Sequence, residues 1–196
     1  MLRRRKPFRE PKPRVLIVCE GGVTEEQYFN DLCNRERKTI LVTESGGDPK
    51  TLVEKAASMM KASKRNASKD ANERYDHVWC VFDRDEHTRY ADALQQARDN
   101  GIKVALSNPC FELWALLHFQ DQRAWIDRSN VQHLCRQHMP GYVKRLPCDT
   151  LYPFVDEAKR RAIELDHWHA TRGTTGDNPS TTVYLLVDII RPPRGV

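Results

Sequence analysis

The sequence has no apolar run near the roughly 20 residues that cross a bilayer, and no apolar stretch behind its charged first residues. We therefore expect a cytoplasmic protein with neither a membrane anchor nor a secretory signal. There is no Cys-x-x-Cys pair, which argues against a zinc ribbon, and no internal repeat. The six cysteines stand at irregular spacings, several inside apolar segments, which is typical of reduced core thiols rather than of a disulfide framework.

A small cluster of metal-ligand residue types is formed by His133, Cys135 and His138. A zinc site needs a fourth ligand, and the neighbouring sequence offers none. The surrounding residues have the pattern of a helix over 129–138, which makes these three side chains ordinary members of its faces. We favour the helix without a metal.

Positive charge is concentrated at the start of the chain. Residues 1–14 carry +6 and the whole chain carries +5, which leaves −1 for all the rest. Three prolines and the lack of an apolar pattern predict a basic flexible arm over 1–13. Such an arm can lie along a phosphate backbone or simply keep a protein soluble. The basic residues expected to contact nucleic acid are Arg3, Arg4, Arg5, Lys6, Arg9, Lys12 and Arg14.

After the arm, apolar segments alternate with helical patterns, which is typical of parallel strands covered by helices. With 196 residues the chain is long enough for one domain and short for two. We predict an α/β core over 14–120, with a parallel four-stranded sheet flanked by helices, and a mainly helical extension over 121–196 packed on it. The predicted strands are 15–19, 39–44, 77–83 and 103–107. The predicted helices are 24–37, 48–64, 89–101, 109–119, 129–138, 150–166 and 181–190.

The segment RVLIVCEGGVTEEQYF places Glu20 directly after a buried strand. In open α/β sheets, ligands bind outside the carboxyl ends of the strands, so this carboxylate is a candidate site residue. Gly21 and Gly22 permit a tight turn, and Thr24 with Gln27 predicts a capping box that starts the next helix. The positive end of that helix favours an anion or a phosphate nearby. A Glu at a strand end can also serve only to cap a neighbouring helix.

The segment VWCVFDRDEH ends another predicted strand and offers Asp83 and Asp85. Residues two apart on an extended chain point the same way, so these carboxylates would repel each other unless a cation neutralises them. Oxygen ligands of this kind suit Mg²⁺ or Mn²⁺. His87 returns to the same side, and its ordinary pKa of about 6.5 suits proton transfer. Together with Glu20, these residues form a candidate catalytic centre and metal site.

The fourth predicted strand leads into SNPCFELWALLHF, where Asn108 and Pro109 have the form of an N-cap and a first-turn proline. Glu112 lies in the first turns of that helix, off its apolar stripe and at the same edge of the sheet. It is a fourth acidic metal ligand, a group that supports the ligands without touching the metal, or an acid that the helix dipole favours there. Asn178 and Pro179 repeat the pattern before TTVYLLVDII, for which a helix is favoured over a strand.

Four segments, LIVCEGGVTEEQYF, VFDRDEH, SNPCFELWALLHF and NPSTTVYLLVDII, resemble the RloB-like protein family in this order. The resemblance covers nearly the whole chain after the arm. Such proteins look like small, single-domain relatives of the TOPRIM fold of primases, topoisomerases and OLD-type defence nucleases. The resemblance implies Mg²⁺-dependent phosphodiester chemistry, with the TOPRIM glutamate at Glu20 and the Asp-x-Asp pair at Asp83 and Asp85. The chain departs from the family pattern at Gly22 and Val23, where members often carry charged residues.

Members of this family are often encoded beside an ATPase in bacterial restriction or phage-defence loci, which implies an ATPase partner. We therefore expect a nuclease of anti-phage defence that acts on DNA or RNA, tRNA included, as a monomer or a homo-oligomer. A HAD-type phosphatase also uses a strand-end Asp-x-Asp, although its pair usually follows the first strand, where this chain has Glu20. A regulatory subunit that binds metal or nucleotide without catalysis stays open as well. No lysine is evidently placed to hold the phosphate.

Overall fold

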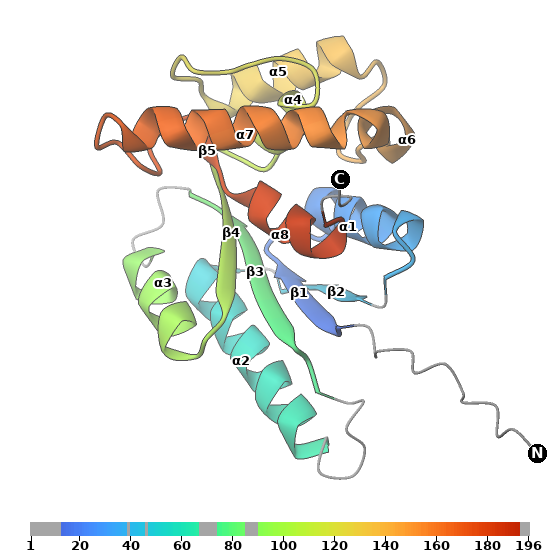
Figure 1. Ribbon diagram of the computed structural model, residues 1–196, viewed down its shortest axis with the longest axis vertical. Coiled ribbons are helices and arrows are strands. Elements are labelled where there is room, and N and C mark those ends of the chain that lie inside the picture. The colour runs from blue at the N-terminus through green and yellow to red at the C-terminus, as the bar shows by residue number, and fades with distance from the viewer. Residues whose placement is uncertain (1–12, 39, 46, 67–73, 85–89, 193–196) are drawn as a thin grey trace, which may run out of the picture.

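The computed structural model describes residues 13–38, 40–45, 47–66, 74–84 and 90–192. Within these residues the chain forms a five-stranded sheet with helices on both faces (Figure 1). The strand order is β2-β1-β3-β4-β5. The strands are β1 (Val15–Cys19), β2 (Ile40–Glu44), β3 (His77–Asp83), β4 (Lys103–Asn108) and β5 (Ser180–Thr181).

The first four strands form the parallel part of the sheet and lie where the sequence predicts them. β1 pairs in parallel with β2 and β3, and β3 pairs in parallel with β4. The prediction of only four strands is wrong, because Ser107 and Asn108 of β4 pair antiparallel with Thr181 and Ser180 of β5. A strand of two residues is too short to show an alternating pattern in the sequence.

The central strands are apolar because both of their faces are buried. Side chains along a strand point alternately to the two faces of the sheet. Leu16 and Val18 accordingly join one core cluster, whereas Ile17 and Cys19 join the other. No residue of β1 is more than 2% exposed. The continuous apolar run therefore correctly predicted a strand with two covered faces.

Helices cover the two faces of the sheet unequally (Figure 1). α2 (Pro49–Asn66) and α3 (Tyr90–Asp99) pack on one face, with Leu52 and Ala93 among their buried residues. On the other face lie α1 (Thr24–Arg35), α4 (Glu112–Leu116) and α8 (Val183–Ile190), with Phe29, Trp114 and Leu186 in the larger core cluster. None of the helices within the described ranges is long and apolar enough to cross a membrane.

An outer layer of helices packs on the inner helices of this second face and lies across the end of the sheet where the parallel strands finish (Figure 1). It comprises α5 (Arg128–His138), α6 (Cys148–Leu151), the 3-10 turn η2 (Tyr152–Phe154) and α7 (Val155–Ala170). The helix predicted over 150–166 is present, extends beyond both predicted ends and is interrupted by η2, where Pro153 lacks a backbone N–H. Because β5 and α8 also belong to 121–196, that region completes the sheet and one of its covers.

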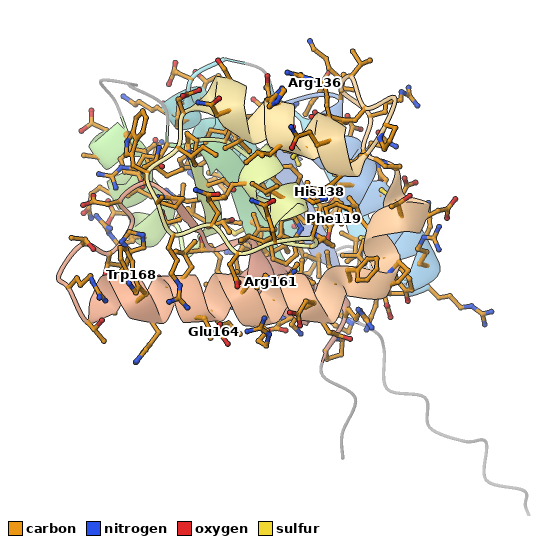
Figure 2. The ribbon with its side chains drawn as sticks, turned by 90° about the horizontal axis from the view of Figure 1, so that it is seen from above. Phe119, Arg136, His138, Arg161, Glu164 and Trp168 are labelled. Carbon is orange, nitrogen blue, oxygen red and sulfur yellow. The ribbon has the colours of Figure 1, made fainter. Side chains whose placement is uncertain are left out.

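Figure 2 shows the outer layer from above, with Arg161, Glu164 and Trp168 along α7. Arg161 Nη1 donates to the backbone O of Leu117, at 2.8 Å, which ties α7 to the end of α4. On the α5 side, the rings of Phe119 and His138 stack with their centroids 4.9 Å apart. The outer layer is therefore joined to the inner helices by both polar and aromatic contacts.

The two predicted Asn–Pro helix starts are wrong. The Asn108–Pro109 and Asn178–Pro179 peptides are cis, and the following helices begin later, at Glu112 and Val183. Both Asn side chains hold loops together instead of capping helices. Asn108 Nδ2 donates to the backbone O of Gly176 (3.0 Å). The side chain of Asn178 bonds to the backbone N and O of residue 126, at 3.1 and 2.8 Å.

Candidate functional site

Two carboxylates lie side by side where β1 and β3 end. The backbone N of Glu20, which follows β1, donates to the O of Val81 in β3 (2.9 Å). The backbone N of Asp83, the last residue of β3, donates to Glu20 Oε2 (3.2 Å). Because β1 and β3 are neighbouring parallel strands, their carboxyl ends bring both acids to one edge of the sheet. The structure therefore places two of the predicted site residues together.

Two further acids, at the starts of helices, line a cavity of about 290 Å³ at this edge. Glu25 lies in the first turn of α1, and Glu112 is the first residue of α4. Glu25, Asp83 and Glu112 all line the cavity and are only 8%, 9% and 9% exposed. Acidic side chains are rarely buried so far unless they are paired. The predicted residue Glu112 thus joins the cluster, and Glu25 is an addition that the sequence did not single out.

Burial and mutual repulsion raise the pKa of two of these acids. Burial, and next the charge of Glu25, raise the pKa of Asp83 well above its ordinary value, against the opposing effect of Arg128. Burial raises the pKa of Glu25 from 4.5 to about 7, and the charges of Glu112 and Glu20 add to the effect. A positive charge beside a buried carboxyl opposes both burial and repulsion by other acids, and so lowers its pKa. A cation beside this cluster would therefore allow the acids to ionise together.

One cation of the outer layer, Arg128, contacts this cluster. Arg128 begins α5, and its Nη2 lies 3.2 Å from Asp83 Oδ2 in an ion pair. Asp127 caps α5 by accepting from the backbone N of Asn130 (2.9 Å), which fixes the start of the helix beside the acids. The Arg128 side chain is 43% exposed, so the guanidinium that touches Asp83 is also accessible to an anion from solvent.

The outer layer also orients Glu112. The hydroxyl of Tyr142 donates to Glu112 Oε1 at 2.9 Å, and Gln132 Nε2 of α5 donates to the same oxygen at 3.3 Å. Tyr142 is itself buried, at 4% exposure. These two donors fix the direction of the carboxylate, as supporting residues around a metal ligand or catalytic group do.

A loop over 140–147 brings a lysine to the cavity. Thr24 Oγ1 donates to the backbone O of Lys144 (2.9 Å), and Gln27 Nε2 donates to that of Leu146 (3.1 Å). The predicted capping box is therefore wrong: both side chains bind this loop, and α1 starts after Val23 without a side-chain cap. Lys144 lines the cavity and could not be found from local sequence, because 120 residues separate it from Thr24.

The two glycines after β1 leave room for carboxylates. A Cβ on Gly21 would collide with the carboxylate of Glu25, and a Cβ on Gly22 would collide with that of Glu44 at the end of β2. Glu44 is exposed, whereas Glu25 is buried. Both glycines are thus explained by close approach of an acid, in addition to the tight turn that the sequence suggested.

Other predicted site residues lie outside the described part of the chain. These are Asp85, His87, Arg3, Arg4, Arg5, Lys6, Arg9 and Lys12. Arg14 is described: its backbone N donates to Asp76 Oδ2 (2.8 Å), and its guanidinium lies over the ring of Tyr75, 5.2 Å from the centroid. It precedes β1 and so lies at the amino end of the strand, opposite the acids.

The side chains of His133, Cys135 and His138 have separate partners. His133 contacts Gln137, Cys135 Sγ lies 3.4 Å from the backbone O of Glu112, and His138 Nε2 lies 2.9 Å from Gln120 Oε1. Across the described residues, no group of three or more His, Cys, Asp or Glu side chains is already arranged to hold a metal ion.

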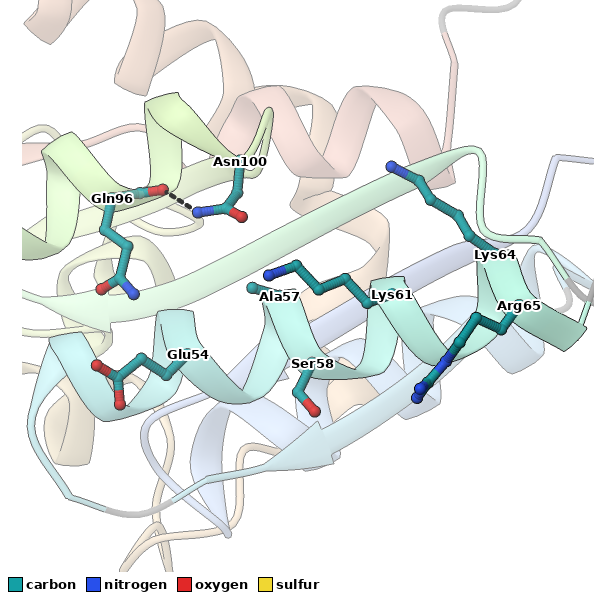
Figure 3. A pocket seen from close by; sticks show the side chains of 8 residues that line it. All are labelled: Glu54, Ala57, Ser58, Lys61, Lys64, Arg65, Gln96 and Asn100. Carbon is teal, nitrogen blue, oxygen red and sulfur yellow. Dashed lines mark hydrogen bonds between the residues drawn. The ribbon is translucent and has the colours of Figure 1, made fainter.

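A larger cavity, of about 640 Å³, lies elsewhere, between α2 and α3 (Figure 3). Lys61, Lys64 and Arg65 of α2 line one side of it, and Gln96 and Asn100 of α3 line the other. None of the clustered acids lines this cavity. Size alone therefore does not locate the candidate site, which is identified by its buried carboxylates.

The sequence model of one protein family, described as RloB-like protein, matches residues 15–190, which is most of the chain. The match includes all four clustered acids as well as Arg128 and Lys144. No curated protein and no solved structure matches the chain.

Proposed function

Since the chain belongs to the RloB-like family, we propose that it is a TOPRIM-like nuclease that cleaves nucleic-acid phosphodiesters with Mg²⁺ or Mn²⁺. The observation that carries the proposal is the convergence of Glu20, Glu25, Asp83 and Glu112 at the carboxyl ends of parallel strands. A mostly parallel α/β sheet with acids at this edge is compatible with a TOPRIM arrangement.

The donor set fits a hard divalent cation. All four clustered groups are carboxylates, and oxygen ligands of this kind suit Mg²⁺ and Mn²⁺. Burial and the neighbouring acids raise the pKa values of Asp83 and Glu25, and a bound cation would oppose both effects. Glu20 and Asp83, with Asp85 two residues later in the sequence, would hold the ion, and Glu112 would do so directly or through water. When bound, the ion stabilises negative charge on the phosphate and lowers the pKa of water.

The remaining groups suit the substrate. Arg128 and Lys144 both line the cavity, and a guanidinium can hold two phosphate oxygens at once. In hydrolysis, the oxygen of water bonds to phosphorus while the bond to one ester oxygen breaks. Glu20 is the candidate base for the proton that the water loses, and His87 is the candidate donor of a proton to the leaving oxygen. Lys144, in the loop over 140–147, would thus be the lysine that holds the phosphate, which no sequence pattern indicated.

The proposal extends to the biological setting that the family resemblance implies. There the chain acts in bacterial anti-phage defence beside an ATPase encoded nearby. The ATPase would control when the acidic edge meets nucleic acid, because a nuclease without such control would damage its own cell.

Asp83→Asn tests the proposal. A ligand that binds only the folded state raises the melting temperature by mass action, so wild type should show a shift with Mg²⁺ or Mn²⁺ that the variant lacks. Without metal, the variant should melt at the same temperature or slightly higher, because one of several repelling charges is gone. It should also lose cleavage of plasmid, single strands and tRNA. Asp99→Asn is the matched control, since Asp99 ends α3 and does not line the acidic cavity.

Retention of the metal shift in Asp83→Asn, or unfolding of that variant, would show that Asp83 has only a structural role. A metal shift in wild type without cleavage of any of the three substrates, even with the neighbouring ATPase present, would favour the regulatory subunit instead.

A further inference from the structure

Of the four tryptophans, all within the described residues, one stands out by its exposure. Trp79 and Trp114 are at most 3% exposed, and Trp168 is half-buried beneath Arg172, whose guanidinium carbon lies 4.3 Å from a ring centroid. Trp125 is 71% exposed. An indole is a large apolar ring with a polar N–H, and such rings commonly become buried when a partner binds.

The backbone around Trp125 is held in place on both sides. Before it, Gln122 Nε2 donates to the O of Ala124 (2.7 Å). After it, Ile126 is buried, and its backbone N and O both bond to the side chain of Asn178. The segment that carries the ring is therefore fixed before a ligand binds. Stacking on the ring then costs little conformational entropy of the backbone.

Trp125 precedes α5, the helix whose first residue, Arg128, lies at the mouth of the acidic cavity. Two residues separate Trp125 from Arg128, so their Cα atoms are at most about 11 Å apart. Arg128 in turn contacts Asp83. Across the cavity, Val143 and Lys144 belong to its lining, and Val143 is 80% exposed. Each of the two exposed apolar side chains, Trp125 and Val143, is thus followed along the chain by a cation that lines the cavity.

The exposed charges beside Trp125 and Val143 favour a polyanion at the mouth, whereas the acids that line the cavity are buried. Arg123 and Arg128 flank Trp125, and Lys144 and Arg145 follow Val143, and all four are exposed. The nearby acid Asp127 accepts from the backbone and side chain of Asn130, so it is committed to the cap of α5. Phosphates can contact the cations while an aromatic ring offers a stacking surface to a base.

We propose that this mouth binds an unpaired strand of nucleic acid, with one base stacked on Trp125 and an adjacent phosphate held by Arg128 and Lys144. The inference rests on the proposed function and narrows its substrate to single strands, loops or frayed ends. A paired base hides its faces in the helical stack, so duplex nucleic acid cannot use the indole in this way. The sugar is not read by such stacking, so DNA and RNA strands should both bind.

Binding can be measured without catalysis. In EDTA at low salt, wild-type protein is titrated with fluorescently labelled oligothymidylate and oligouridylate of about 12 nucleotides, and with a duplex of equal length. Anisotropy reports affinity, and intrinsic fluorescence reports stacking on the exposed indole. Trp125→Ala should weaken binding of both single strands by about 5- to 100-fold and remove most of the quenching, while Trp125→Phe should keep most of the affinity.

Two control variants test whether a loss of affinity is specific to Trp125. One removes another tryptophan and the other removes a cation far from the acidic cavity. Trp168→Ala removes a tryptophan from α7, and Lys64→Ala removes a cation from the groove between α2 and α3 (Figure 3). Both should bind single strands like wild type. Lys144→Ala should weaken binding of single strands and reduce its salt dependence. Circular dichroism checks that each variant is folded, which is expected for Trp125 because its ring is exposed.

Unchanged single-strand affinity in Trp125→Ala would overturn the inference, as would an equal loss of duplex affinity in that variant. Failure of wild type to bind either strand would also overturn it. These outcomes are independent of the proposed reaction, because no metal and no cleavage enter the measurement. Cleavage that survives Trp125→Ala undiminished would leave the nuclease proposal intact and refute only the stacking site.

Discussion

Replacing Glu25 by Gln should make the metal-free protein more stable, by an amount that depends on pH. The pKa of Glu25 is about 7 in the folded chain because the carboxyl is buried among other acids, and its ordinary value is 4.5. Between these values the folded chain binds more protons than the unfolded chain, so stability falls as pH rises from about 4.5 to about 7. Glu25→Gln cannot ionise and should escape this loss.

The size of the effect follows from the same two pKa values. At about 1.4 kcal/mol per pH unit, the interval from 4.5 to about 7 corresponds to about 3 kcal/mol. We therefore expect Glu25→Gln to exceed wild type by up to about 3 kcal/mol at pH values well above 7, and by almost nothing below about pH 4. In the acid range, Glu25 is protonated in both states and the two proteins differ only by an amide.

Urea unfolding in EDTA, followed by circular dichroism across this pH range, measures the difference in free energy of unfolding. Glu26→Gln is the matched control, because Glu26 is the next residue of α1 but is only partly buried and does not line the cavity. It should show no comparable pH-dependent gain. This expected pH dependence would be refuted if Glu25→Gln gained stability equally at acid and alkaline pH, or if it lost stability above pH 7. In either case the ionisation of Glu25 would not be what destabilises the wild-type protein.

Two further changes probe the same cluster. Gly21→Ala should cost about 1–3 kcal/mol of stability in urea melts, as overpacking usually does, because the added methyl group meets the buried carboxylate of Glu25. Gly22→Ala should stay within about 0.5 kcal/mol of wild type, because the exposed side chain of Glu44 can rotate away; equal costs for the two would contradict this. Glu112→Gln should weaken Mn²⁺ binding about 10- to 100-fold by calorimetry, and unchanged affinity would leave Glu112 only a structural role.

The sequence predicted the parts of the fold that have a local pattern. Apolar runs such as 15–19 and 77–83 are typical of strands buried on both faces, and the four parallel strands lie where expected. The Asn–Pro pairs failed because a cap and a loop tether use the same side-chain chemistry. Only tertiary contacts decide between them, here those of Asn108 with Gly176 and of Asn178 with residue 126.

In the candidate site too, the sequence predicted only the residues that have a local pattern. Glu20 and Asp83 could be placed because strand ends mark an edge of the sheet. Glu25 was missed because an acid in the first turn of a helix is expected for the helix dipole alone. Arg128, Tyr142 and Lys144 have no local signal, since their partners lie in distant parts of the sequence.

Several contacts of the mouth join residues that are far apart in the sequence, so they can form only late in the synthesis of the protein. Asp83 and Arg128 are 45 residues apart, and Thr24 and Lys144 are 120 apart, so the cationic half of the mouth follows the acidic half along the chain. The segment that carries Trp125 is in turn held by Asn178. Because synthesis proceeds from the N-terminus and distant contacts form only when both partners are available, the acids emerge from the ribosome well before their cations. A chain that ends before Arg128 therefore has an incomplete mouth, and nucleic-acid binding of the kind proposed here arises only after Asn178 has been made.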